Sequence, residues 1–253
     1  MKLAIAGKGG VGKTTLAALL AYIYAGEGQH VIAIDADPAA SLANALGLPA
    51  ELAAQARPIA EMDALIEERT GAKPGTVGGF FSLTPRVDDI PQRFSVSHRG
   101  VRLLRMGSVR GGGTGCICPE SAMLKALVNH LVLYQDETLI MDMEAGLEHL
   151  GRATAGAVDA FIAVAEPGRR SLDTAQRIRQ LAAEIGVETV YLVGNKVRDA
   201  SEAEFIQNNA AGLTLLGHLP FDPAAGEADR SGQAVFDAAP SLAQAAGEIA
   251  RLL

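Results

Sequence analysis

A glycine-rich stretch near the start of the chain, GKGGVGKTT at 7–15, has the residue types of a phosphate-binding loop. It fits the pattern Gly-x4-Gly-Lys-Thr, with an apolar run before it and a helix-like run after it. Glycines let the backbone curl so that N–H groups face phosphate oxygens, and the helix adds its positive end. Lys13 would serve the β- and γ-phosphates, and Thr14 offers Mg²⁺ a hydroxyl. We therefore predict an ATP or ADP site formed by Gly9, Gly10, Val11, Gly12, Lys13, Thr14 and Thr15.

Acidic side chains at three positions are candidates for metal and water chemistry. Asp35 ends the apolar run at 30–35 and Asp37 follows it, and their spacing puts both side chains on one face of an extended backbone. Asp142 closes the run TLIMDM at 138–143, at the edge where open parallel sheets bind ligands. We expect Asp142 to hold Mg²⁺ directly or through water. A turn at the first pair and a helix cap at Asp142 are the alternative interpretations.

The two cysteines of the chain, Cys116 and Cys118, are candidates for a metal site. Their spacing lets both thiols point the same way, and Pro119 suits the first position of a helix, where thiolates are favoured. A closed zinc site needs four ligands, so a two-fold dimer would have to supply the other two. Thiolates also suit other transition metals. The pair could instead be incidental small apolar residues or a strained redox disulfide.

Apolar runs that alternate with helix-like stretches indicate how these residues are positioned. The runs are short and apolar on both faces, which is typical of parallel strands covered by helices on both sides. We therefore expect an α/β fold with a single doubly wound, mainly parallel sheet, as in P-loop NTPases. The expected strands are 2–6, 30–35, 101–106, 138–143, 160–165, 189–195 and 213–219. The expected helices include 14–25, 121–132, 171–186, 202–212 and 240–253.

The whole chain, 1–253, is expected to form a single P-loop ATPase domain, with a less regular insertion at about 50–100. The chain can form a large hydrophobic core, because 49% of its residues are hydrophobic. A net charge of −7 disfavours attraction to nucleic acid or anionic lipid. No apolar run reaches the roughly 18 residues of a membrane span, and the first apolar run is short for a signal peptide. We expect a cytoplasmic protein.

The second lysine of the phosphate loop, Lys8, has no role in the general pattern. GKGGVGKT resembles the deviant Walker A motif of the MinD/ParA/nitrogenase-iron-protein family. The resemblance implies that Lys8 reaches across a two-fold dimer to the partner's nucleotide, in the role of an arginine finger. A solvated lysine is the alternative. The resemblance further implies that Asp37, within DADPAASL at 35–42, positions or activates the attacking water, with Asp35 near the Mg²⁺ shell.

The same resemblance suggests residues for the base. In related ATPases an Asn at the end of the strand expected at 189–195 reads the purine edge, and here that residue is Asn195. Pro220 and Asp222, on either side of Phe221, would flank the base. Asn and Asp-Pro sequences are also common in turns, so a purely structural role is the alternative.

Four motifs together, GKGGVGKTT, DADPAASL, GCICPES and DMEAGLEHLGR, resemble the accessory ATPases of carbon monoxide dehydrogenase, the CooC type. Glu144 stands where the wider family usually has proline, which makes the last motif more particular. The resemblance implies an ATPase that assists nickel insertion into the dehydrogenase. Zinc or nickel would lie between two subunits, on Cys116 and Cys118. Glu144, Glu148 and His149 have no assigned role, and a solvated helix start explains their polarity equally well.

Two other functions are compatible with the phosphate loop. A MinD/ParA-like positioning or partition ATPase would act on membrane or DNA, but the closing helix at 240–253 carries Arg251 as its single basic residue, and the chain is acidic. An iron–sulfur electron carrier like nitrogenase iron protein would need cysteines from two separate regions. We therefore expect a homodimer formed on ATP or metal binding, with carbon monoxide dehydrogenase as client and neither nucleic acid nor membrane as partner.

Overall fold

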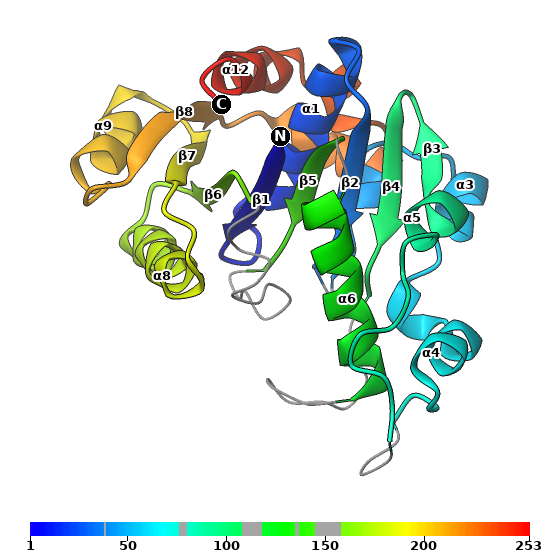
Figure 1. Cartoon of the computed structure of the whole chain (residues 1–253). Coiled ribbons are helices and arrows are strands. Elements are labelled where there is room, and N and C mark those ends of the chain that lie inside the picture. The colour runs from blue at the N-terminus through cyan, green and yellow to red at the C-terminus, as the bar shows by residue number, and fades with distance from the viewer. Residues whose placement is uncertain (38, 76–79, 108–117, 135–136, 145–157) are drawn as a thin grey trace.

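A single mixed sheet organises the molecule. The computed structural model describes residues 1–253 except 38, 76–79, 108–117, 135–136 and 145–157. Within this range the strands form one eight-stranded sheet in the order β3-β4-β2-β5-β1-β6-β7-β8 (Figure 1). Neighbouring strands are parallel, except β3 with β4. This confirms the predicted fold class. The strands are β1 (Lys2–Gly7), β2 (Val31–Asp35), β3 (Val96–His98), β4 (Val101–Arg105), β5 (Thr138–Asp142), β6 (Ala160–Ala165), β7 (Val190–Val197) and β8 (Thr214–Pro220).

The predicted strands are all found, with ends shifted by a residue or two. The short antiparallel strand β3 was missed, because Val96–His98 is too short to show an alternating pattern. It lies in the segment at 50–100, which the structure builds from short elements. These are α3 (Ala50–Gln55), a 3₁₀ turn (Ile59–Glu61), α4 (Asp63–Thr70) and α5 (Ile90–Phe94).

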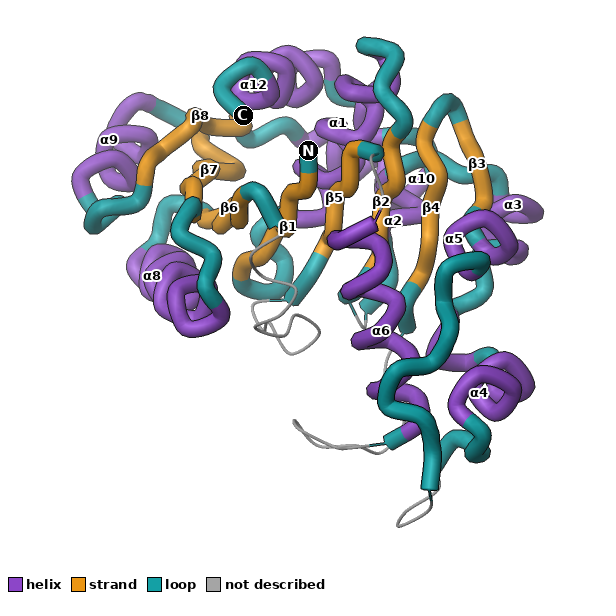
Figure 2. Tube along the Cα trace, viewed as in Figure 1, coloured by secondary structure: helices purple, strands orange, loops and turns teal. Residues whose placement is uncertain are grey.

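Helices cover both faces of the sheet (Figure 2). Figure 1 shows α1 and α12 on one face and α6 and α8 on the other, in agreement with the two hydrophobic clusters to which they contribute. Helix α6 begins at Pro119, the first helical position predicted for it. Apart from the short elements above, the helices are α1 (Lys13–Gly26), α2 (Leu42–Ala45), α6 (Pro119–Tyr134), α8 (Arg169–Ile185), α9 (Ala200–Asn208), α10 (Pro223–Ser231), α11 (Val235–Ala238) and α12 (Pro240–Ala250).

The core lies on both sides of the central strands, because alternate side chains of a strand point to opposite faces. In β1, Leu3 and Ile5 join the cluster of α1 and α12, while Ala4 and Ala6 join the cluster of α6 and α8. Burial of each large aliphatic side chain contributes about 1.5–3 kcal/mol. The packing on both faces fixes the carboxyl end of β1, from which the phosphate loop departs.

No helix in the described ranges combines the length and the apolar character needed to cross a bilayer.

Candidate nucleotide-binding site

The phosphate loop leaves β1 at the centre of the sheet and leads into α1. Strand β1 is paired with β5 on one side and with β6 on the other, so the chain connections diverge at this strand. Such a switch point, at the carboxyl ends of parallel strands, is where open α/β sheets bind ligands. Gly7 fits closely against β6, since a Cβ there would lie 2.6 Å from the carbonyl oxygen of Val164.

The loop's curl depends on glycines in the left-handed region. Gly10 has a φ of 79° and Gly12 a φ of 94°, which disfavour any residue with a side chain. Gly12 also has no room for a side chain, because a Cβ there would lie 2.0 Å from Asn195 Nδ2. The residue is the N-cap of α1, so the helix's free N–H groups begin directly behind it. This conformation gives the loop the inward-facing backbone that phosphate binding requires.

Lys13 and Asp37, predicted as catalytic, lie together. The Lys13 ammonium is 3.3 Å from Asp37 Oδ2, and both side chains are almost wholly buried. Asp37 is itself held by the N–H of Ala39, which donates to Asp37 Oδ1 at 2.9 Å. The carboxylate balances the charge of the lysine, and a phosphate at this place would compete for the same ammonium.

Thr14, Asp35 and Asp142 form the adjoining acidic corner. The Thr14 hydroxyl donates to Asp142 Oδ2 at 2.6 Å, and Ser41 Oγ lies 3.2 Å from the same hydroxyl. Asp35 and Asp142 are register partners on the neighbouring strands β2 and β5. Burial raises the pKa of Asp142 to about 7, and the nearby Asp35 carboxylate adds to the effect. Burial likewise raises the pKa of Asp35 to about 6.

The acidic corner has the donors that Mg²⁺ needs. Asp142 Oδ1 and Asp35 Oδ1 are buried, and neither has a hydrogen-bond partner in the described part of the chain. Carboxylate and hydroxyl oxygens are the ligands that Mg²⁺ prefers, and a divalent cation would offset the cost of ionising these buried carboxyls. Thr14 and Asp142 therefore fit a magnesium site, bound directly or through water, with Asp35 beside it.

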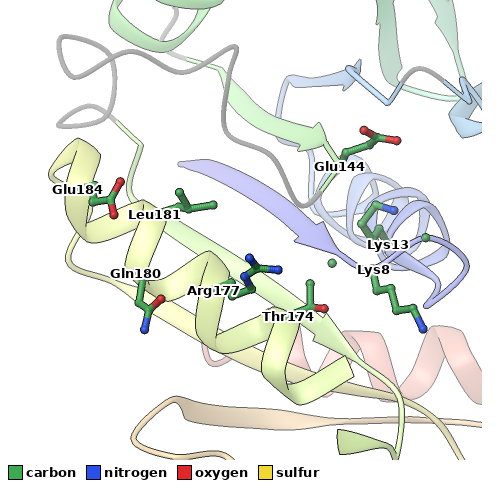
Figure 3. A pocket seen from close by; sticks show the side chains of 10 residues that line it. Lys8, Lys13, Glu144, Thr174, Arg177, Gln180, Leu181 and Glu184 are labelled. Carbon is green, nitrogen blue, oxygen red and sulfur yellow. The ribbon is translucent and has the colours of Figure 1, made fainter. Parts of the chain in front are cut away.

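Lys8 lies on the outer side of the loop, where it is exposed. It borders a cavity of 630 Å³ between the loop and α8, to which Arg177 and Glu184 contribute (Figure 3). Figure 3 shows the side chains of Lys8 and Lys13 pointing apart, and Glu144 borders the same cavity. Within the described ranges, Lys8 forms no ion pair. Lys8 thus differs in exposure and in ion pairing from Lys13, which is buried and paired with Asp37 although it borders the same cavity.

A second cavity, of 470 Å³, lies on the other side of the loop. The predicted base residues Asn195, Pro220 and Asp222 all line it. Two of these side chains already have partners. The Asn195 amide donates to the carbonyl of Val11 at 2.6 Å. Asp222 caps α10 by accepting from the N–H of Ala224 at 2.9 Å, and it also accepts from the Ser241 hydroxyl at 2.5 Å.

The predicted thiolate site is only partly visible. Cys116 lies outside the described residues, as do Glu148 and His149. Cys118 is buried, directly before α6, and its carbonyl accepts the N–H of Ala122 at 3.0 Å, as expected at a helix start. Among the described residues, no three His, Cys, Asp or Glu side chains gather closely enough to hold a metal ion.

Sequence reasoning missed three contributors to the site. Ser41 contacts the Thr14 hydroxyl, and its only signal was its place after the acidic pair. Lys196 donates from its ammonium to the carbonyl of Gly10 at 2.6 Å, which no spacing rule links to a loop so distant in the sequence. Arg177 reaches the front cavity only because α8 packs beside β1.

A glycine-rich loop at the switch point, a buried lysine and a hydroxyl–carboxylate corner define a nucleotide-binding P-loop NTPase. The family profile of the CobQ/CobB/MinD/ParA nucleotide-binding domain matches residues 2–235, and the chain belongs to this family. Carbon monoxide dehydrogenase accessory protein CooC of Rhodospirillum rubrum is 47% identical over 95% of this chain and 91% of its own. An uncharacterised ATP-binding protein of Methanocaldococcus jannaschii is 43% identical over 88% and 86%. The resemblance expected from the sequence is thereby confirmed.

Solved structures show the same fold. The cell division ATPase MinD of Pyrococcus furiosus superposes with a TM-score of 0.69 at 19% identity, covering 99% of this chain and 98% of that one. A ParA family ATPase of Chlorobium tepidum also gives 0.69, at 18% identity and with 99% and 97% covered. MinD of Pyrococcus horikoshii, solved with Mg-ADP, gives 0.67 at 19% identity, with 99% and 95% covered.

Proposed function

We propose that the chain is a Mg²⁺-dependent ATPase that assists nickel insertion into carbon monoxide dehydrogenase. The observation that carries the proposal is the relationship to the Rhodospirillum rubrum accessory protein, which extends over almost the whole of both chains. The chain's own Cys-x-Cys pair at 116–118 supports it, because thiolates are suitable ligands for nickel and zinc.

Hydrolysis would use the residues gathered at the loop. Lys13 would leave Asp37 and bind the β- and γ-phosphates, and the freed Asp37 would then orient the attacking water. Thr14 and Asp142 would hold Mg²⁺. When bound, this ion neutralises charge that develops on the phosphates. The Lys13–Asp37 ion pair thus links phosphate binding to the release of the proposed water-positioning residue.

The front of the loop would face a second copy of the chain. Lys8 is exposed at the edge of a cavity, where it could reach the phosphate of a second subunit. Lys13 is instead buried and paired with Asp37. ATP would join two subunits face to face, with each Lys8 stabilising charge on the partner's nucleotide. The same two-fold axis would bring two Cys116–Cys118 pairs together, and four thiolates would hold zinc or nickel. Hydrolysis would loosen the dimer and change the geometry of this metal site.

Activation of a nickel-deficient client tests the function. Nickel-deficient carbon monoxide dehydrogenase is incubated with Ni²⁺, Mg²⁺, ATP and the purified chain, and carbon monoxide oxidation is measured. We expect activation with the wild-type chain, and none with Lys13→Ala or without ATP. Equal activation by the wild-type chain and the Lys13→Ala variant would show that the proposed function is wrong.

A further inference from the structure

The end of strand β7 contacts the back of the phosphate loop through two consecutive side chains. Asn195 Nδ2 donates to the carbonyl of Val11 at 2.6 Å, and Lys196 Nζ donates to the carbonyl of Gly10 at 2.6 Å. The two acceptors are themselves consecutive in the loop. A pair of neighbouring donors is thus matched to a pair of neighbouring carbonyls.

These contacts are held in place from several directions. Asn195 is buried, with 4% exposed, and its Oδ1 accepts from the N–H of Lys196 at 2.8 Å. The Lys196 ammonium also lies 3.4 Å from Glu166 Oε2, just beyond β6. Lys196 has a φ of 58°, a left-handed conformation that is costly for a residue with a side chain. Both residues lie where the pairing of β7 with β8 is irregular, between Gly194 and Val197.

The carbonyl contacts bear on phosphate binding because a peptide unit is planar and trans. In such a unit the C=O and the following N–H point in opposite directions. A donor that holds the Gly10 carbonyl outward turns the N–H of Val11 inward, and a donor on the Val11 carbonyl does the same for Gly12. The N–H of Val11 donates across the loop to the Lys8 carbonyl at 3.3 Å, a long hydrogen bond that a phosphate oxygen would replace.

We infer that Asn195 and Lys196 are positioning residues, which orient the phosphate-binding N–H groups of the loop from behind. This inference rests on the proposed nucleotide binding at the loop and adds how the loop is held in its binding conformation. It also gives Asn195 a role different from purine reading, because its amide is engaged with the backbone of Val11 and Lys196. A residue of this kind affects every phosphate ligand equally, whatever base is attached.

Equilibrium calorimetry with Mg²⁺ and three probes, ADP, GDP and pyrophosphate, separates the two roles. Lys196→Met keeps the aliphatic stem but removes the donor. The loss of one such hydrogen bond should weaken ADP and pyrophosphate by the same factor, about five- to tenfold. Lys196→Arg keeps a cationic donor and should restore both affinities. Asn195→Ala should likewise weaken both probes and leave the ratio of ADP to GDP affinity unchanged.

Arg198→Met is the matched control. It removes a positive charge two residues away, and the Arg198 guanidinium lies over the Phe221 ring without a contact to the loop. We expect it to leave the affinity for pyrophosphate, which has no base, unchanged. The inference is overturned if Lys196→Met leaves pyrophosphate binding unchanged, if Arg198→Met weakens it equally, or if Asn195→Ala alters only the ratio of ADP to GDP. Failure of the wild-type chain to bind ADP would overturn the nucleotide site itself.

Discussion

Two lysines of the phosphate loop, five residues apart, have opposite surroundings. Lys13 is buried and paired with Asp37, whereas Lys8 is exposed on the outer side of the loop. A buried cation beside a phosphate acts within its own site, and an exposed one is available to a second molecule. In the proposed dimer, this difference would separate phosphate binding within one subunit from catalysis between two.

Alanine variants of the two lysines should therefore fail in different ways. Lys13→Ala removes a desolvated charge at the phosphates and should weaken ATP binding by at least about 30-fold. Lys8→Ala should leave ATP binding by the isolated subunit unchanged but lower kcat by about 10³-fold, the effect of losing a cation supplied in trans. Calorimetry and phosphate release measure the two quantities. Unchanged turnover by Lys8→Ala would show that Lys8 is only solvated.

Asp37 should matter for turnover more than for affinity. Asp37→Ala removes the proposed water-positioning carboxylate and should lower kcat by about 10²- to 10⁴-fold. ATP affinity should be kept or improved, because Lys13 loses its competing partner. Steady-state phosphate release and equilibrium binding are compared with Glu51→Gln, an exposed acidic position on α3. A variant that hydrolyses ATP at the wild-type rate would rule out this role.

At the scale of elements, Asp89 joins two short helices of the segment at 50–100. Asp89 Oδ2 accepts from Arg69 of α4 at 2.8 Å and from Arg93 of α5 at 2.7 Å. These hydrogen bonds, that from Arg69 first, hold the pKa of Asp89 well below its usual value. The ionised carboxylate therefore stabilises the fold fully above the unfolded pKa of about 4, and this stabilisation is lost progressively as the pH falls from there through the lower pKa of the folded state.

Asp89→Asn should lower the Tm by about 2–4 °C at pH 7, for a loss of about 1 kcal/mol at this partly exposed site. The difference in Tm between the variant and the wild-type chain should be smaller at pH 3, and calorimetry at both pH values measures it. Asp88→Asn is the neighbouring control, because Asp88 pairs with the largely exposed Arg86 and its substitution should change the Tm little. An equal loss at both pH values would mean that charge is not the cause.

Helix α12 illustrates how an element limits the possible functions. Leu242, Ala246 and Ile249 are buried in the cluster that α12 shares with α1. The apolar face of this helix is thus already used in packing. A membrane-binding helix needs that face for lipid, so α12 offers little support for a MinD-like membrane function.

The elements that the sequence predicts best are those encoded in contiguous residues. The phosphate loop was recognisable because its glycines, Lys13 and Thr14 are adjacent, and long apolar strands were found nearly to the residue. The pairing of Asp35 with Asp142 could not be predicted in detail, because the strand order that makes β2 and β5 neighbours is a property of the whole sheet. Lys196 was missed for the same reason.

At the scale of the whole molecule, the proposed function requires that two copies associate, because only then would nucleotide and metal chemistry meet. Thiols at 116 and 118 would provide two ligands in each chain, and Lys8 is exposed on the outer side of the loop. In this proposal both features would remain incomplete within one subunit. The proposed ATP-dependent dimer would complete both together. The property to measure is therefore the number of subunits, nucleotides and metal ions in one complex.

Native mass spectrometry of the chain with a non-hydrolysable ATP analogue, Mg²⁺ and Ni²⁺ or Zn²⁺ measures this stoichiometry directly. We predict a dimer that carries two nucleotides and a single thiolate-bound ion, and a Cys116→Ala/Cys118→Ala dimer that carries the nucleotides without the ion. A monomer without the ion at saturating nucleotide, or equal ion binding by the double variant, would contradict the account.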